Sequence, residues 1–252
     1  MRLRRLRPRL LAAQALTAAL ALSGVLAPGP PRLALARPPA TTTTTMADPA
    51  PRLPPDAVAI PIVAQQTDYS CGPAALASIL RHHRVWKGRE RELYTLLRTH
   101  PEHGTLPEDL AAGARRFGLQ AAVERNMTLE RLRALLGERK LVILDVQAWP
   151  DDGRPLAWSE RWDDGHYVVL IGMDERFGFL MDPSVEGAFA YVPLDELVAR
   201  WHDVNRRTAV EELDIRLGVV IWREAPADRP ATGGAVSART GSVPPRRLVR
   251  LE

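Results

Sequence analysis

Cysteine is almost absent from this sequence, in which Cys71 is the one cysteine among 252 residues. A single cysteine excludes a disulfide within the chain, and the lack of a Cys-x-x-Cys pair excludes a cysteine-rich zinc site. Most isolated cysteines are buried and serve as small hydrophobic side chains. An unpaired thiol is a liability in an oxidising compartment, however, and its presence there would favour a functional reason for it.

Acidic side chains are absent from residues 1–37, which contain seven arginines. Five of these arginines precede an apolar stretch over residues 10–27, and the small-x-small sequence Ala34-Leu35-Ala36 follows it. This pattern predicts a secretory signal peptide over residues 1–36 and an exported, periplasmic or extracellular protein. Because about 18 mostly apolar residues are marginal for a membrane span, an uncleaved N-terminal anchor remains the alternative.

Apolar periodicity is missing from two further stretches. Residues 37–55 consist mostly of Pro, Ala and Thr, and residues 226–252 are rich in Pro, Gly, Ala, Arg and Ser. We expect a disordered linker in the first stretch and a disordered basic tail in the second. One folded domain then spans residues 56–225, a length sufficient to bury a hydrophobic core.

The net charge of +4 does not describe this domain. Residues 1–37 contribute +7 and residues 226–252 contribute +3, so the remaining residues 38–225 carry −6. A mildly acidic domain argues against nucleic acid as a partner. We expect contact with a membrane only through the N-terminal segment.

Helical patterns come first in the domain, and strand patterns follow. We predict helices over residues 72–83, 89–98, 107–117, 128–137 and 193–201, with Thr105 and Thr128 capping the third and fourth. We predict strands over residues 119–124, 141–144, 166–172, 179–181, 189–192 and 217–222, and a long loop over residues 149–164. This order indicates an α+β fold with N-terminal helices packed on a mostly antiparallel sheet.

Cys71 stands at the predicted start of the first helix. Pro73 suits the first helical turn, where its missing N–H is not needed, and Gly72 allows another group to approach the backbone closely. At this position the helix dipole and the unpaired N–H groups of the first turn stabilise a thiolate. The sequence therefore places a nucleophile where it would be activated.

Acyl transfer by a cysteine also needs an imidazole, a group that orients the imidazole, and donors for the oxyanion. His166 begins a predicted strand and Asp182 ends the next one, so a hairpin that turns near Asp174 would bring them together. Asp182 would then fix the tautomer of His166. The N–H of Cys71 and the side-chain amide of Gln65 would form the oxyanion hole, with Gln66 as a competing donor.

Other side chains offer alternative roles. Asp163 and Asp164 precede His166 and could orient it instead, although adjacent loop acids are usually solvated. The tryptophans of the long loop could line a substrate cleft or simply cover the core; these are Trp149, Trp158 and Trp162.

The remaining histidines are weak metal ligand candidates. His82 and His83 lie near a helix C-terminus, where histidines often only meet the helix dipole. His100 and His103 lie in a loop rich in Pro and Gly, and we expect them to be solvated. We predict no metal site and no cofactor.

The quoted motifs together resemble a known family. Gln65, followed six residues later by Cys71-Gly72, then Gly165-His166-Tyr167-Val168-Val169 and Asp182-Pro183, is similar to the papain-like cysteine peptidases that remove double-glycine leaders from bacteriocin precursors. The resemblance covers about residues 58–225. It implies a papain-like fold, a Cys-His-Asp triad of Cys71, His166 and Asp182, and an oxyanion role for Gln65. Because it has a predicted export signal, the chain is more similar to the stand-alone, exported relatives than to the family members that are fused to a transporter.

The sequence favours an exported cysteine peptidase that hydrolyses peptide bonds through an acyl-enzyme, with a peptide or protein as its substrate. Acyl transfer to an amine on the same fold is an alternative, because it proceeds through the same acyl-enzyme. A catalytically silent binding or adaptor protein is the non-enzymatic alternative. The sequence gives neither the cleavage motif nor the oligomeric state.

Overall fold

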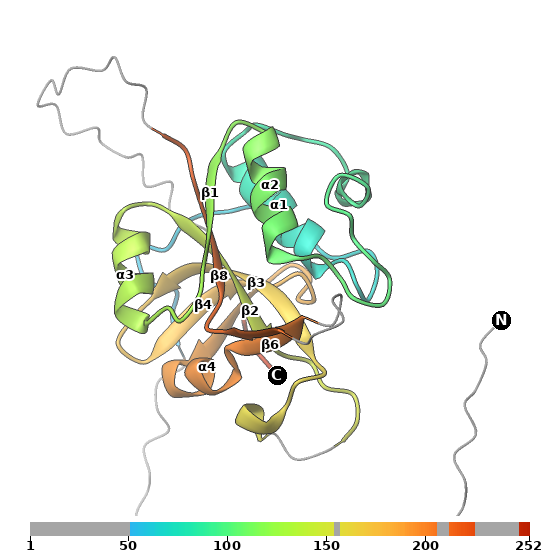
Figure 1. Cartoon of the computed structure of the whole chain (residues 1–252). Helices are drawn as coiled ribbons and strands as arrows, with labels where there is room; N and C mark the ends of the chain where they lie inside the picture. Colours follow the sequence, from blue (N-terminus) through green and yellow to red (C-terminus); the bar gives the residue numbers. More distant parts are fainter. Residues whose placement is uncertain (1–50, 154–156, 206–211, 225–246) are drawn as a thin grey trace, which may run out of the picture. The chain divides into compact units, whose positions relative to one another are not determined.

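The computed structural model describes residues 51–153, 157–205, 212–224 and 247–252. These residues form helices packed on a large, mostly antiparallel sheet (Figure 1), so the predicted α+β fold class is confirmed. The predicted signal peptide, residues 37–50 of the linker and residues 226–246 of the tail lie outside the described residues.

Helices predominate in the first part of the domain and strands in the second. The helices are α1 (Cys71–His82), η1 (Glu90–Leu93), α2 (Pro107–Arg116), α3 (Leu129–Gly137), η2 (Trp158–Glu160) and α4 (Leu194–Arg200), where η marks a 3₁₀ helix. The strands are β1 (Gln120–Glu124), β2 (Leu141–Gln147), β3 (Gly165–Met173), β4 (Phe177–Met181), β5 (Phe189–Pro193), β6 (His202–Asn205), β7 (Glu212–Ile215), β8 (Gly218–Trp222) and β9 (Leu248–Arg250).

Seven strands form the main sheet in the order β1-β8-β2-β3-β4-β5-β9, and β6 pairs with β7 in a separate ribbon. All neighbours in the main sheet are antiparallel except β5 and β9. The predicted turn near Asp174 joins β3 to β4, because Oδ1 of Asp174 accepts hydrogen bonds from the N–H groups of Arg176 and Phe177.

Strand β3 shows why its sequence is apolar at nearly every position. Side chains alternate between the faces of a strand. Val169 and Ile171 lie in the core beneath α1 and α2, whereas Val168 and Leu170 lie in the core on the other face, beneath α3 and α4. Helices thus cover both faces of the sheet around β3, the strand that carries His166.

Two local predictions about the helices were wrong. The helix expected over residues 89–98 is reduced to the short η1 and a series of turns. Thr105 does not cap α2; the helix follows Leu106, and the hydroxyl of Thr105 is buried against that of Thr99, at 2.9 Å. Thr128 does cap α3, because its hydroxyl accepts a hydrogen bond from the N–H of Arg131.

The predicted boundaries of the domain were too narrow at both ends. Residues 51–55 of the expected linker are described, and Leu53 packs against the core. Residues 247–252 of the expected disordered tail instead add β9 to the sheet edge, and Leu251 is fully buried. The tail prediction was therefore wrong for these last six residues. None of the described helices is long and apolar enough to cross a membrane.

Candidate active site

Cys71 is the first residue of α1, and only 8% of its surface is exposed. The loop before it is held by Ser70, whose hydroxyl accepts hydrogen bonds from the N–H groups of Gln66 (3.2 Å) and Thr67 (3.1 Å). A Cβ at Gly72 would lie only 3.0 Å from the side chain of Thr105. Glycine therefore allows the start of the helix to pack closely against the neighbouring loop, as its position suggested.

His166 and Asp182 meet at the ends of neighbouring strands. His166 is the second residue of β3, and Asp182 directly follows β4. The Nε2 atom of His166 lies 2.7 Å from Oδ1 of Asp182, and both side chains are buried. The expectation that the hairpin brings these two side chains together agrees with this geometry.

Asp182 is fixed by two further donors. The N–H of Ser184 donates to Oδ1 at 2.7 Å, and the indole N–H of Trp149 donates to Oδ2 at 2.9 Å. Burial disfavours the charge on Asp182, but His166 and these two donors lower the pKa of the carboxyl overall. The carboxylate is therefore ionised and held in one orientation.

The thiol of Cys71 lies close enough to His166 to interact with its imidazole. Asp182 engages Nε2 of His166, which leaves Nδ1 as the ring nitrogen that can serve the thiol. Burial alone would lower the pKa of His166, but Asp182, and then Cys71, raise it to about 10. The arrangement can therefore hold an imidazolium between a carboxylate and a thiol, which is the charge state that cysteine acyl chemistry requires.

Gln65 is tied to the segment that follows Asp182. Its backbone N–H donates to the carbonyl of Pro183 (3.0 Å), and its Oε1 accepts from the hydroxyl of Ser184 (3.2 Å). Its Nε2 donates to the carbonyl of Thr67 at 3.0 Å, which leaves a second N–H on the same nitrogen. The amide thus lies between the loop before Cys71 and the loop after Asp182.

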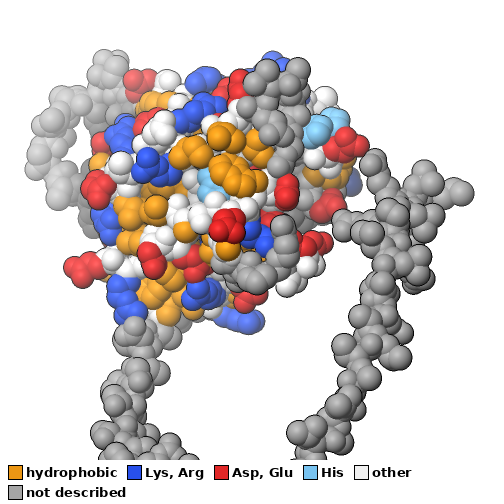
Figure 2. Space-filling view, turned by 60° about the horizontal axis from the view of Figure 1, so that its bottom comes forward, with side chains coloured by type: hydrophobic (Ala, Val, Ile, Leu, Met, Phe, Trp, Pro, Cys, Tyr) orange, Lys and Arg blue, Asp and Glu red, His pale blue; other side chains and the backbone are white. Residues whose placement is uncertain are grey.

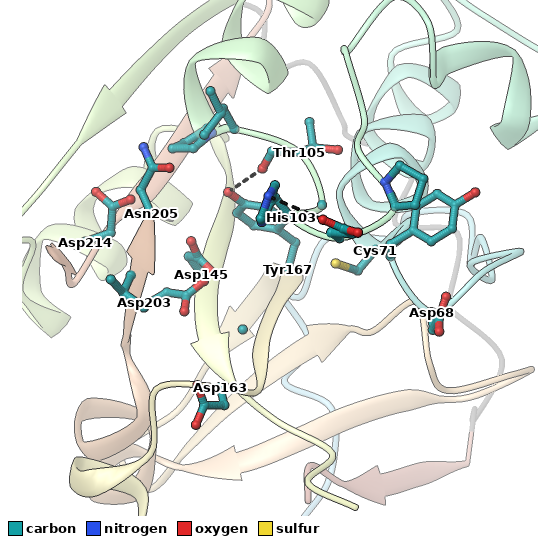
Figure 3. Close-up of a pocket in the computed structure, with 18 residues that line it drawn as sticks. Asp68, Cys71, His103, Thr105, Asp145, Asp163, Tyr167, Asp203, Asn205 and Asp214 are labelled. Atoms are coloured by element: carbon teal, nitrogen blue, oxygen red, sulfur yellow. Dashed lines mark hydrogen bonds and ion pairs between the residues drawn. The ribbon is translucent and has the colours of Figure 1, made fainter. Parts of the chain in front are cut away.

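A cavity of about 300 Å³ opens beside Cys71 (Figure 3). Its described lining combines the loop before Cys71, the loop around Gly104, the start of β3 and the β6–β7 ribbon. Tyr167 closes the wall next to the thiol, and its hydroxyl donates to the carbonyl of Thr105 at 3.1 Å. Six acidic residues line this space: Asp68, Glu102, Asp145, Asp163, Asp203 and Asp214.

Residues 59–205 match the peptidase C39 family. The chain belongs to this family. It is similar to two uncharacterised proteins, from Methanothermobacter thermautotrophicus (35% identity) and Methanothermobacter marburgensis (33% identity), each over 124 residues that cover 49% of this chain and 72% of the relative. The family membership agrees with the resemblance drawn from the motifs around Cys71, His166 and Asp182.

Solved structures of the C39 type share lower similarity. A double-glycine motif protease from an AMS/PCAT transporter, solved with its leader peptide, is 18% identical with a TM-score of 0.46, covering 67% of this chain and 94% of its own. A Bacillus anthracis protein described as C39-like is 15% identical with a TM-score of 0.47, covering 66% and 96%.

The alternative acids lie away from His166 in this C39 domain. Asp164 pairs with Arg161 at 2.7 Å, and Asp163 lines the cavity. Gln66 is the competing candidate for the oxyanion donor. Its backbone N–H bonds to the hydroxyl of Ser70. Of the acids considered, Asp182 is the one within hydrogen-bonding distance of the imidazole.

The tryptophans of the long loop do not line the cavity. Trp149 contacts Asp182, Trp158 packs under the guanidinium of Arg200 (3.5 Å from the ring centre), and Trp162 packs against the ring of His202. Of the two roles left open, these positions favour a covering role for Trp158 and Trp162. The sequence pattern did not reveal the contact between Trp149 and Asp182.

The remaining histidines occupy separate places. Nδ1 of His82 lies 3.0 Å from the carbonyl of Ala59, and burial lowers the pKa of His83 to about 4. His100, Glu102 and His103 are exposed, and their ligand atoms lie within 4.8 Å of one another. The rings of His100 and His103 are stacked, with centroids 4.9 Å apart.

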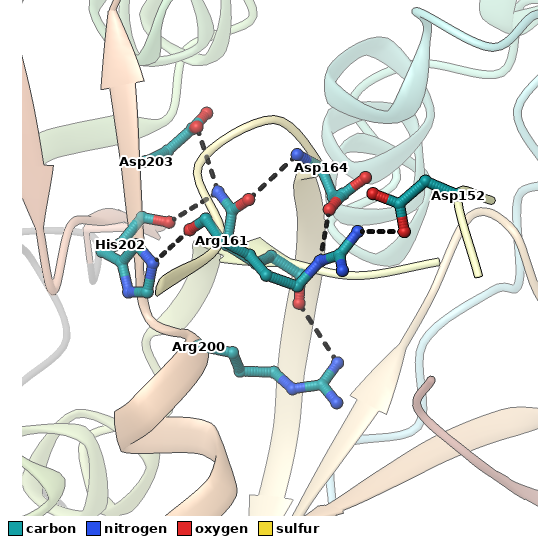
Figure 4. A network of polar contacts seen from close by, with 7 residues as sticks. Asp152, Arg161, Asp164, Arg200, His202 and Asp203 are labelled. Atoms are coloured by element: carbon teal, nitrogen blue, oxygen red, sulfur yellow. Dashed lines mark hydrogen bonds and ion pairs between the residues drawn. The ribbon is translucent and has the colours of Figure 1, made fainter. Parts of the chain in front are cut away.

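A polar network that no motif indicated connects the long loop to β2 and β6 (Figure 4). The amide of Gln147 donates to the carbonyl of His202 (3.0 Å) and to Asp203 (3.1 Å), and accepts from the N–H of Asp164 (2.9 Å). Nε2–H of His202 donates to the carbonyl of Arg161 at 2.7 Å. These bonds join β2, the long loop and β6, and they hold Asp203 at the cavity.

Proposed function

We propose that this chain is a cysteine peptidase that hydrolyses peptide bonds with Cys71 as the nucleophile, His166 as the general acid and base, and Asp182 as the orienting group. Membership of the C39 family supports a peptidase-like function. The single observation that carries the assignment of residues is the 2.7 Å contact between Nε2 of His166 and Oδ1 of Asp182, with Cys71 near enough to interact with the same imidazole.

The proposed reaction begins with attack of the Cys71 thiolate on the carbonyl carbon of the scissile bond. The N–H of Cys71 and the free N–H of Gln65 Nε2 would stabilise the negative oxygen that develops. The imidazolium of His166 then gives its proton to the leaving amine, and an acyl-enzyme remains. His166, now neutral, takes a proton from the water that attacks the thioester, the sulfur leaves as a thiolate when the acid is released, and the thiolate–imidazolium pair is restored.

We also propose that the protein acts outside the cytoplasm. This proposal rests on the arginine-rich, apolar N-terminal sequence, which has the pattern of an export signal. Cleavage of the segment and its retention as an anchor remain two forms of the same proposal. N-terminal sequencing of the mature protein distinguishes them, because cleavage removes residues 1–36.

The rate of alkylation of Cys71 by iodoacetamide tests the proposed function without a substrate. Cys71 is the one cysteine of the chain, so the label reports on it alone. We expect fast labelling near pH ~6 that slows sharply in His166→Ala, because the imidazolium stabilises the thiolate. His82→Ala is the matched control: this histidine lies at the opposite end of α1 and should leave the rate unchanged.

The proposal would be refuted if Cys71 were alkylated slowly, with the pH dependence of an unactivated thiol, and at the same rate in His166→Ala. That result would favour a catalytically silent binding protein. Once a substrate is found, product analysis with and without an added amine separates hydrolysis from acyl transfer. Cys71→Ala should abolish turnover in either case.

A further inference from the structure

The described lining of the cavity beside Cys71 carries a concentration of acidic side chains. This described lining contains six acidic residues and no lysine or arginine, with His103 as the one basic group. By contrast, Figure 2 shows acidic and basic side chains interspersed over one face of the molecule. The negative charge is therefore gathered within reach of the thiol.

Asp145 and Asp214 are the most buried of these acids, and Asp145 is the one of the two without an arginine partner among the described residues. It belongs to β2, only 4% of its surface is exposed, and its Oδ1 atom is buried without any hydrogen-bond partner. Figure 3 shows its carboxylate in the cavity wall between Asp203 and Tyr167. A buried carboxylate oxygen without a partner is costly and is normally satisfied by a donor or a cation.

Neighbouring acids add to this demand. Burial, and then the charges of Asp203, Asp214 and Cys71, raise the pKa of Asp145 well above its ordinary value. Arg125 pairs with Asp214 at 2.7 Å, but it is shared with Glu108 at 3.0 Å. The guanidinium therefore offsets only part of the charge. A cation that reached Asp145 would offset these neighbouring charges and favour its ionised form.

We infer that this cavity is a binding subsite for a cationic side chain, lysine or arginine, of the peptide substrate. The inference rests on the proposed peptidase function and names the substrate class of the same site. The side chain would enter beside Cys71 and reach Oδ1 of Asp145, with Asp203 across from it. The thiol lines the same cavity, so a bound basic residue lies next to the scissile bond.

The placement of the acids suits an organic cation better than a metal ion. Within the described residues, the only group with three ligand atoms close enough for a metal is the exposed one of His100, Glu102 and His103. Asp145, Asp203 and Asp214 do not converge in this way. Spread carboxylates match an ammonium or guanidinium group, which carries several donors at its tip.

Three thiol reagents of different charge test this inference without a known substrate. They are 2-(trimethylammonium)ethyl methanethiosulfonate (cationic), methyl methanethiosulfonate (neutral) and 2-sulfonatoethyl methanethiosulfonate (anionic), applied to the full chain. Each rate is divided by its rate with N-acetylcysteine amide, which removes intrinsic reactivity. We expect the corrected rate with the cationic reagent to be at least about ten times the corrected rate with the neutral reagent, since a cleft of one charge concentrates the opposite charge.

Charge-removing variants locate the effect. Asp145→Asn and Asp203→Asn keep the side-chain shape, and each should lower the ratio by about threefold or more. Glu175→Gln is the matched control, because Glu175 is exposed in the turn between β3 and β4 and does not line the cavity. It should leave the ratio unchanged.

A saturation experiment distinguishes a binding site for the cation from a general electrostatic attraction by the acidic cleft. Nα-acetyl-lysine amide should slow iodoacetamide labelling of Cys71 in a saturable way, whereas Nα-acetyl-norleucine amide, which has the same four-carbon chain without the ammonium group, should not. The protection should be lost in Asp145→Asn. Equal protection by both compounds, or by neither, would overturn the inference.

The two proposals fail separately. If labelling depends on His166 but the corrected rates ignore reagent charge, the subsite is refuted and the peptidase proposal stands. If the cation preference depends on Asp145 but labelling ignores His166→Ala, the cavity still binds cations and the peptidase proposal is refuted.

Discussion

The contact between His166 and Asp182 should make the stability of the fold depend on alkaline pH. The pKa of His166 rises from 6.5 to about 10 on folding. A histidine with a raised pKa stabilises the fold fully below its unfolded pKa, and this stabilisation is lost as the pH rises through the folded pKa. The window for His166 is therefore pH 6.5 to about 10. The lowered pKa of Asp182 acts at the other end, where stability is lost as the pH falls below its ordinary 3.8.

The size of the effect follows from the linkage between protons and folding. One pKa unit corresponds to about 1.4 kcal/mol, so the full shift of His166 sets a ceiling of about 5 kcal/mol. The Cys71→Ala background removes the effect of the thiol on His166. Asp182 raises the pKa of His166 more than Cys71 does. We therefore expect about 2–4 kcal/mol to remain in this background.

Urea unfolding of Cys71→Ala at five pH values between 6 and 10 measures this loss. The matched control is Cys71→Ala with Asp182→Asn, in which the amide cannot hold the charge on His166. The free energy of unfolding of the control should be nearly level over the same range. Parallel pH profiles in the two proteins would refute the reasoning, because the pH dependence would then come from groups other than this pair.

Three further substitutions test the supports of the site and fold. Trp149→Phe keeps the apolar body but removes the donor to Asp182, so unfolding should cost about 1–2 kcal/mol less and alkylation of the thiol should slow. Thr128→Ala removes the cap of α3 and should cost about 1 kcal/mol in urea unfolding, with alkylation unchanged. Leu251→Ala should cost about 2 kcal/mol or more in thermal unfolding, since the side chain is fully buried, whereas Leu213→Ala, exposed beyond half, should cost almost nothing.

The elements that carry the site could be predicted from the sequence because their signals are local. The pair Gly72-Pro73 indicates a helix start at Cys71, and the β-branched run after His166 indicates a strand. The turn at Asp174 then determines that β3 and β4 are neighbours. These three local features are sufficient to expect His166 and Asp182 side by side.

The surroundings of the site could not be predicted in the same way, because they depend on contacts between distant residues. Gln147 and His202 are 55 residues apart, and nothing in either neighbourhood indicates that one bonds to the other. Likewise β9 lies in a stretch whose composition indicates disorder. Its short apolar sequence becomes a strand only because the edge of β5 is available to it.

The structural unit that supports the site is longer than the part of the chain that matches the family. The match ends at residue 205, yet β8 lies between β1 and β2 in the main sheet, and its valines are buried on both faces. The last residue also contributes, because the carbonyl of Glu252 accepts a hydrogen bond from the N–H of Trp149, at 2.5 Å. Trp149 holds a left-handed backbone conformation (φ 57°), which is costly for a bulky residue and needs such support. The indole of the same residue donates to Asp182, so the position of the carboxylate proposed to orient His166 depends on the C-terminal strand as well as on the hairpin that carries it.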